Sequence, residues 1–94
     1  MAHRDLERIR RAFREARYTL TEHAYDELDE DRLDILDIVA AILTGEIDAV
    51  LTMDPRGNRY VIIGCATDQT TRVAIVCSFI ERDELLVLTV YVPD

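Results

Sequence analysis

The fold is decided by the stretch Arg72-Val-Ala-Ile-Val-Cys-Ser-Phe-Ile-Glu-Arg-Asp-Glu-Leu-Leu-Val-Leu-Thr-Val-Tyr-Val92. Two runs rich in β-branched and aromatic residues, 72–80 and 85–92, flank the polar link 81–84. This pattern is typical of two strands joined by a turn. Because a parallel crossover needs a dozen residues or more, the two strands are expected to pair antiparallel.

Alternation along these two strands predicts which side chains face the core, since successive residues of a strand point to opposite faces. The predicted core face consists of Val73, Ile75, Cys77, Phe79, Leu86, Leu88, Val90 and Val92. Val87, Thr89 and Tyr91 are predicted to lie on the other face, together with Arg72.

Two further strands are predicted upstream, at 47–53 and 58–66, with turn residues in Asp54-Pro-Arg-Gly-Asn58 and Asp68-Gln-Thr-Thr71. Before them, the apolar spacing predicts helices over 4–16, over 22–28 with Thr21 as the N-cap, and from Asp34 to Thr44. The short segment 18–21 is β-prone. The predicted fold class is therefore α+β, with two to three N-terminal helices packed on one face of a four-stranded antiparallel sheet.

Length and composition are those of one small domain. The chain has 94 residues, of which 49% are hydrophobic, and no apolar run approaches the roughly 18 residues that span a membrane. The first residues lack the apolar segment of a signal peptide, so a cytoplasmic location is expected. In a reducing compartment, Cys65 and Cys77 are expected to be small buried hydrophobes, and a disulfide between neighbouring strands is the alternative.

Charge is unevenly distributed along the chain. All 11 basic residues are arginines, and the net charge is −8. Residues 1–18 hold six arginines and three acids, whereas 22–37 hold eight acids and one arginine. A net acidic protein repels nucleic acid at long range, so an RNA contact would need a local basic patch. The acidic cluster could attract a hard cation, but its spacing matches no EF-hand loop, which favours a solvated face or a partner for the arginines. We therefore expect no metal, and with three glycines and no phosphate loop we expect no cofactor.

His23 and the solvent face of the sheet are the candidate functional features. A histidine is the usual general acid or base near neutral pH, but His23 could equally be a surface residue that is hydrogen-bonded to backbone or to Glu27. Arg72, Tyr91 and Arg59 on an open sheet face would suit phosphate, because guanidinium groups bind phosphate oxygens bidentately. The alternative is that these are ordinary charged and aromatic residues on the solvent side of a sheet.

Several ordered segments resemble a known bacterial family. They are Thr21-Glu-His-Ala-Tyr-Asp-Glu-Leu28, Asp37-Ile-Val-Ala-Ala-Ile-Leu-Thr-Gly-Glu46, Asp54-Pro-Arg-Gly-Asn-Arg-Tyr-Val-Ile-Ile-Gly64, Val76-Cys77 and Leu88-Thr-Val-Tyr-Val-Pro-Asp94. Together they resemble domain of unknown function 4258 over residues 18–94, with residues 1–17 as a peripheral arginine-rich helix. The family is similar to the RelE/ParE/BrnT-like small toxins. This resemblance implies a RelE-like fold and a metal-independent endoribonuclease paired with a cognate antitoxin.

The resemblance also implies roles for individual residues. The family's helix-opening histidine falls on His23, its strand arginine and tyrosine on Arg59 and Tyr60, and its closing Thr-Val-Tyr on 89–91. The chain departs from its relatives at three positions, where it has Glu27, Asp31 and Ala74.

Two functional hypotheses follow. In a toxin-type ribonuclease, His23 would be the acid or base, Arg59 and Arg72 would hold the scissile phosphate, and Tyr91 would orient the substrate. The alternative is a non-catalytic module that binds another protein or forms a homo-oligomer, as the separation of charge suggests.

Overall fold

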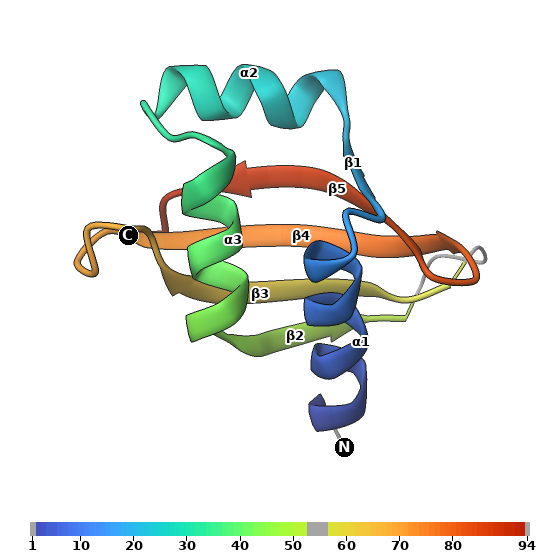
Figure 1. Cartoon of the computed structure of the whole chain (residues 1–94). Helices are drawn as coiled ribbons and strands as arrows, with labels where there is room; N and C mark the ends of the chain where they lie inside the picture. Colours follow the sequence, from blue (N-terminus) through green and yellow to red (C-terminus); the bar gives the residue numbers. More distant parts are fainter. Residues whose placement is uncertain (1, 53–56, 94) are drawn as a thin grey trace.

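A computed structural model describes residues 2–52 and 57–93, with side chains from residue 4 onward. Its elements are α1 (Ala2–Arg14), β1 (Tyr18–Leu20), α2 (Glu22–Glu30), α3 (Ile35–Thr44), β2 (Glu46–Leu51), β3 (Arg59–Cys65), β4 (Arg72–Glu81) and β5 (Glu84–Tyr91). The strands form one sheet in the order β1-β5-β4-β3-β2. Figure 1 shows α1 and α3 crossing one face of this sheet, while α2 runs along its β5 edge. Residues 53–56, which include most of the turn predicted at 54–58, lie outside the described part.

The sheet has five strands, so the prediction of a four-stranded antiparallel sheet was wrong. The additional strand is β1, which pairs in parallel with β5, with Thr19 opposite Leu86. Hydrogen bonds from Leu85 N to Arg17 O (2.9 Å) and from Thr21 N to Val87 O (3.0 Å) extend this pairing at both ends. A three-residue strand shows no periodicity of its own, and its partner lies more than 60 residues away along the chain. The α+β class itself is confirmed.

A β-bulge in β5 overturns part of the predicted core face. Val76 pairs with Thr89, but the next residue, Cys77, pairs with Val87, so Leu88 is an extra residue in β5. Before the bulge, Leu85 and Val87 face the core and are fully buried, and the prediction for Leu86, Val87 and Leu88 was wrong. After the bulge the alternation agrees with the prediction at Val90, which is fully buried, and at Tyr91, which is 39% exposed on the open face. The prediction was wrong for Val92, which follows the end of β5 and is 40% exposed.

Helix α1 packs into the same core as the rest of the chain. Its buried residues are Leu6, Ile9, Ala12 and Phe13. The ring of Phe13 stacks on that of Tyr18, with centroids 4.4 Å apart. Within the described residues, no helix is long and apolar enough to cross a membrane.

Both cysteines are free thiols. Cys77 is fully buried on the core face of β4, and burial raises the pKa of its thiol to about 12. Cys65 lies half-buried on β3, opposite Arg72. The structure thus agrees with the interpretation of the cysteines as packing residues rather than as a bridged pair.

Arg10 links α1 to the end of α3. Its guanidinium donates hydrogen bonds to the carbonyl oxygens of Ile42 and Gly45, both at 3.0 Å. The last carbonyls of a helix have no partners within the helix, and a cation there also compensates the helix dipole.

Replacing Arg10 with methionine should lower the free energy of unfolding by about 2 kcal/mol, because charge-assisted hydrogen bonds are lost at a partly buried site. Urea denaturation measures this loss. Arg11→Met is the matched control, since Arg11 is an exposed neighbour on the same helix. Equal effects of the two substitutions would contradict the capping role.

Two aspartates stabilise local structure through hydrogen bonds: Asp37 at the start of α3, and Asp68 in the loop between β3 and β4. Asp37 completes a capping box with Asp34 and accepts hydrogen bonds from the backbone N–H (3.0 Å) and the hydroxyl (2.7 Å) of Thr67. The backbone and side-chain hydrogen bonds of Thr67 lower the pKa of Asp37. The hydroxyl and backbone N–H of Thr71 lower the pKa of Asp68 to about 2.

Acid should therefore destabilise the fold. The folded-state pKa values of Asp37 and Asp68 lie below their ordinary value of 3.8, so their contributions are present above that pH and are lost as the pH falls toward about 2. The urea concentration at the midpoint of unfolding should fall steadily as the pH is lowered from 3.8 to about 2. In Asp68→Asn the decline should be shallower, and an unchanged decline would contradict this origin.

Candidate functional site

One face of the sheet carries no helix, and its central strands present an apolar surface. Half-exposed residues on this open face are Val61, Ile63, Val76, Leu86 and Leu88, and its more exposed residues include Ile80 and Tyr91. Arg59 and Arg72 are the charged residues that β3 and β4 place on it, at opposite ends. We use the term open face for this surface.

His23 lies at the β5 edge of the sheet, in the first turn of α2. Its Nε2 is 3.4 Å from Oε1 of Glu27, one turn along the helix, and 67% of its side chain is exposed. The same Glu27 oxygen accepts a hydrogen bond from Val90 N at 2.9 Å. Glu27 therefore contacts both the imidazole of His23 and the outer edge of β5. The non-catalytic interpretation of His23 as a surface residue also predicted a contact with Glu27.

Thr21 attaches the start of α2 to the same edge. Its hydroxyl accepts a hydrogen bond from Ala24 N (3.1 Å) and donates one to the carbonyl oxygen of Leu88 (3.1 Å), the bulged residue. The predicted N-cap is thus confirmed. Strand β1 ends at Leu20. Beyond it, the side chains of Thr21 and Glu27 form hydrogen bonds with the backbone of β5 that a neighbouring strand would otherwise make.

Tyr91 and Arg72 come together on the open face. Tyr91 is paired with Ala74, two residues along β4 from Arg72, so Tyr91 and Arg72 are diagonal neighbours with Cα atoms about 7–8 Å apart. Tyr91 also follows Val90, whose N–H binds Glu27. Through Glu27 and Val90, His23 lies near the end of β5 that carries Tyr91, and Tyr91 in turn is a diagonal neighbour of Arg72. We use the term corner for these three residues.

Arg59 lies away from that corner. It pairs with Ser78, whereas Arg72 pairs with Cys65 at the other end of the same two strands, a separation of about 20 Å. The two arginines therefore cannot hold the same phosphate. Tyr60, the family's other strand position, is 5% exposed and belongs to the core.

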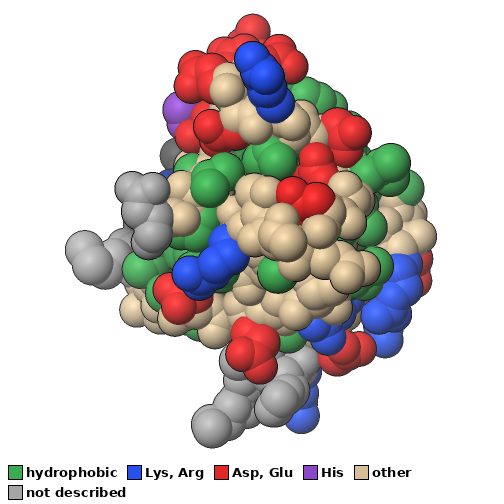
Figure 2. Space-filling view, turned by 90° about the vertical axis from the view of Figure 1, so that its left-hand side faces the viewer, with side chains coloured by type: hydrophobic (Ala, Val, Ile, Leu, Met, Phe, Trp, Pro, Cys, Tyr) green, Lys and Arg blue, Asp and Glu red, His purple; other side chains and the backbone are tan. Residues whose placement is uncertain are grey.

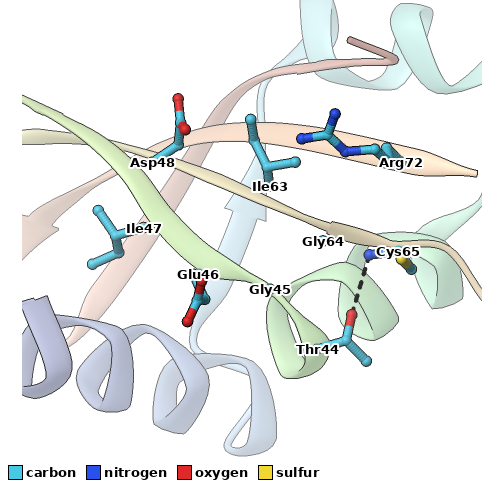
Figure 3. Close-up of a pocket in the computed structure, with 9 residues that line it drawn as sticks. All are labelled: Thr44, Gly45, Glu46, Ile47, Asp48, Ile63, Gly64, Cys65 and Arg72. Carbon is cyan, nitrogen blue, oxygen red and sulfur yellow. Dashed lines mark hydrogen bonds between the residues drawn. The ribbon is translucent and has the colours of Figure 1, made fainter. Parts of the chain in front are cut away.

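A hollow of about 420 Å³ adjoins Arg72 and was not predicted from the sequence. Its lining residues are Thr44, Gly45, Glu46, Ile47, Asp48, Ile63, Gly64, Cys65 and Arg72. Figure 3 shows Asp48, Ile63 and Arg72 extending to one side of the sheet and Ile47 to the other. The pairing of β2 with β3 shifts register between Ile47 and Ala49, and such a shift leaves no mark in the sequence pattern.

A second, smaller hollow of about 280 Å³ lies at the Arg59 end of the open face. It is lined by Gly57, Arg59, Ser78, Phe79, Ile80, Leu86 and Leu88. Leu86 and Leu88 reach it because of the β5 bulge, so it too escaped prediction.

Acidic and basic side chains gather at different ends of the molecule. Figure 2 shows acids over α2 at the top and arginines at the lower right, where α1 lies. Some of the arginines serve the fold: Arg8 lies 4.1 Å from the centre of the Phe79 ring, and Arg17 is 3.9 Å from Asp83. Among the described residues, no group of three or more His, Cys, Asp or Glu side chains is placed to hold a metal ion.

Comparison with known proteins gives one match. No curated protein and no solved structure matches the chain. The family model described as Domain of unknown function (DUF4258) matches residues 20–92, from the end of β1 through β5. The match leaves out α1, although α1 contributes to the core. Since the model covers most of the chain, the protein belongs to the DUF4258 family.

Proposed function

We propose that the protein is a metal-independent endoribonuclease of the RelE-like toxin type, which acts in the cytoplasm and is paired with a cognate antitoxin. The observation that supports this proposal is the corner of His23, Tyr91 and Arg72, in which Glu27 contacts both the imidazole and the β5 edge. An imidazole can transfer protons, a guanidinium can bind phosphate, and an aromatic ring can stack on a base of RNA.

In the proposed reaction, His23 accepts the proton of a ribose 2′-hydroxyl. The 2′-oxygen then attacks the adjacent phosphorus, and the bond from phosphorus to the 5′-oxygen breaks. The leaving 5′-oxygen takes a proton from a water molecule and His23 returns its proton to water, so the products are a 2′,3′-cyclic phosphate and a 5′-hydroxyl. Arg72 neutralises charge that develops on the phosphate, and Tyr91 stacks on a neighbouring base. Glu27, with its Oε1 3.4 Å from Nε2 of His23, would orient the imidazole.

The geometry predicts that the two open-face arginines differ in importance. Arg72→Ala should lower the cleavage rate by about 10²-fold, because the guanidinium next to Tyr91 would bind the scissile phosphate. Arg59→Ala, about 20 Å away, should lower it by less than about threefold. The assay is cleavage of a mixed-sequence RNA by purified protein in the presence of a chelator. Equal losses, or no cleavage by the unaltered protein, would contradict the proposal.

A second candidate function is self-association, which the separation of charge favours. The arginines of α1 and the acids of α2 lie on different elements at different ends of the molecule, so α1 of one copy could bind α2 of the next. Such contacts are screened by salt. Light scattering should then show an oligomer that dissociates as the ionic strength rises, and a monomer at every ionic strength would exclude it.

A further inference from the structure

We propose that the solvent-facing side of α3 is the interface of a homodimer, in which α3 of one copy packs antiparallel on α3 of a second copy. The inference rests on the self-association given above as the second candidate function, and it names the surface and the orientation of that association. It does not depend on whether the protein cleaves RNA.

Helix α3 is apolar on every side. Of its ten residues, Asp37 and Thr44 are the polar ones. Its inner side belongs to the core, where Ile38, Ala41 and Ile42 are fully buried. A surface helix normally has polar residues on the side that faces water, whereas a helix that is apolar all round is normally buried. The composition of α3 therefore indicates that a partner covers its outer side.

The outer side of α3 carries a ridge of apolar residues. Leu36, Ala40 and Leu43 have the i, i+4, i+7 spacing of residues on one face of a helix. Leu36 is 67% exposed, more than any other large hydrophobic residue in the described part of the chain, and Leu43 is 46% exposed. We use the term α3 ridge for these three residues.

The order of large and small residues along the α3 ridge is complementary to a second copy of itself. In an antiparallel pair with the twofold axis between Val39 and Ala40, Leu36 of each copy lies opposite Leu43 of the other. Both leucine pairs form together, because the two leucines are about 10 Å apart along each helix. Val39 then lies opposite the small Ala40, which allows the two helices to approach to about 8 Å.

The two ends of α3 adjoin segments of opposite charge. Residues 22–34, which lead into the start of α3, contain seven acids and one arginine. Helix α1 lies beside the end of α3, where Arg10 donates hydrogen bonds to the carbonyl oxygens of Ile42 and Gly45. Residues 4–14 of α1 contain five arginines and two acids, an excess that Glu46 after α3 lowers but does not cancel. Figure 1 shows α2 at the start of α3 and the N-terminal end of α1 toward the end of α3.

This arrangement of charge favours a second copy as the occupant. In the antiparallel pair, the acidic end of each copy lies against the basic end of the other, so the attraction occurs twice. A parallel pair would place the two acidic ends together. Within the described residues, Arg4 and Arg11 at the basic end and Glu30 at the acidic end are members of no ion pair, so they are available for contacts between copies.

Sedimentation equilibrium of the purified chain should show a dimer. Leu36→Glu and Leu43→Glu should each raise the dissociation constant by about 10²-fold or more, because each places two carboxylates in an apolar contact. Ile80→Glu is the matched control, since Ile80 is 56% exposed on the open face, and it should dimerise as the unaltered protein does. Circular dichroism should confirm that all three variants are folded. A rise in ionic strength should weaken the dimer, because salt screens the charges at the two ends.

Disulfide cross-linking tests the orientation. In a Cys65→Ser background, Leu36→Cys and Leu43→Cys should form a mixed disulfide when the two variants are combined under mild oxidation, and each variant alone should cross-link much less. Cross-linking of Leu36→Cys with itself in preference to Leu43→Cys would overturn the antiparallel orientation.

The outcomes separate the interface from the association itself. An oligomer that dissociates in salt but persists in Leu36→Glu and Leu43→Glu would overturn the α3 interface and leave association through charge in place. Equal dissociation by Ile80→Glu would also overturn the α3 interface. A monomeric unaltered protein would overturn both the interface and the association, and would leave the α3 ridge to a different protein.

Discussion

Gly64→Ala should strongly destabilise the fold. A Cβ atom at residue 64 would overlap the carbonyl oxygen of Ala41 and lie 2.8 Å from its carbonyl carbon and 2.9 Å from its Cα. All three atoms belong to the backbone of α3, and Ala41 is fully buried, so no side chain can rotate away. Helix and strand would have to separate, at a cost of at least about 3 kcal/mol out of a typical total of about 5–15 kcal/mol.

Urea denaturation followed by circular dichroism measures this effect. Gly57→Ala is the comparison, because a Cβ at residue 57 would have no atom of the described residues within 4 Å, but the backbone φ is +131°. Its cost is conformational alone, about 1–3 kcal/mol. If Gly64→Ala were no more destabilising than Gly57→Ala, the close packing of α3 on β3 would be refuted.

His23→Gln should lower RNA cleavage by about 10²–10⁴-fold, the range expected when a general acid or base is removed. The fold should be unaffected, since 67% of the side chain is exposed and the residue it pairs with in the described part of the chain is Glu27. Urea midpoints for His23→Gln and the unaltered protein should therefore agree. His3→Gln, which changes the other histidine of the chain, should retain full activity.

Glu27→Gln separates positioning from chemistry at the same corner. The amide oxygen can still accept the hydrogen bond from Val90, but the negative charge 3.4 Å from the imidazole is removed. Cleavage should fall by less than in His23→Gln, because the imidazole that transfers the proton is still present. A loss as large as that of His23→Gln would contradict a positioning role for Glu27.

Local signals in the sequence were sufficient for the helices and for most of the sheet. The helix that begins after Asp34 has a capping box formed by Asp34 and Asp37, and Thr21 caps α2 as predicted. The strands of the hairpins appeared where the two-residue period and the turn residues placed them. Each of these features depends on residues within a few positions of one another, and such features can be read from a sequence.

The features that escaped prediction depend on distant partners. Strand β1 forms by pairing of residues 18–20 with the edge of β5. At the bulge in β5, the carbonyl oxygen of Leu88 accepts a hydrogen bond from the hydroxyl of Thr21. One extra residue then moved Leu86 and Leu88 to the open face. The sequence was sufficient to propose a histidine, arginines and a tyrosine for the candidate site. The distance between Arg59 and Arg72 depends on the register of β3 against β4, which cannot be read from the sequence.

If the corner of His23, Tyr91 and Arg72 cleaves RNA through the ribose 2′-hydroxyl, as we propose, the chemical ends of the products will show it. They can be mapped for a short RNA by mass spectrometry, with metal ions removed by a chelator. We expect fragments that end in a 2′,3′-cyclic phosphate or 3′-phosphate and begin with a 5′-hydroxyl, and no cut where the scissile nucleotide carries a 2′-deoxyribose. Fragments with 5′-phosphates and 3′-hydroxyls, or continued cleavage of the 2′-deoxy substrate, would contradict it.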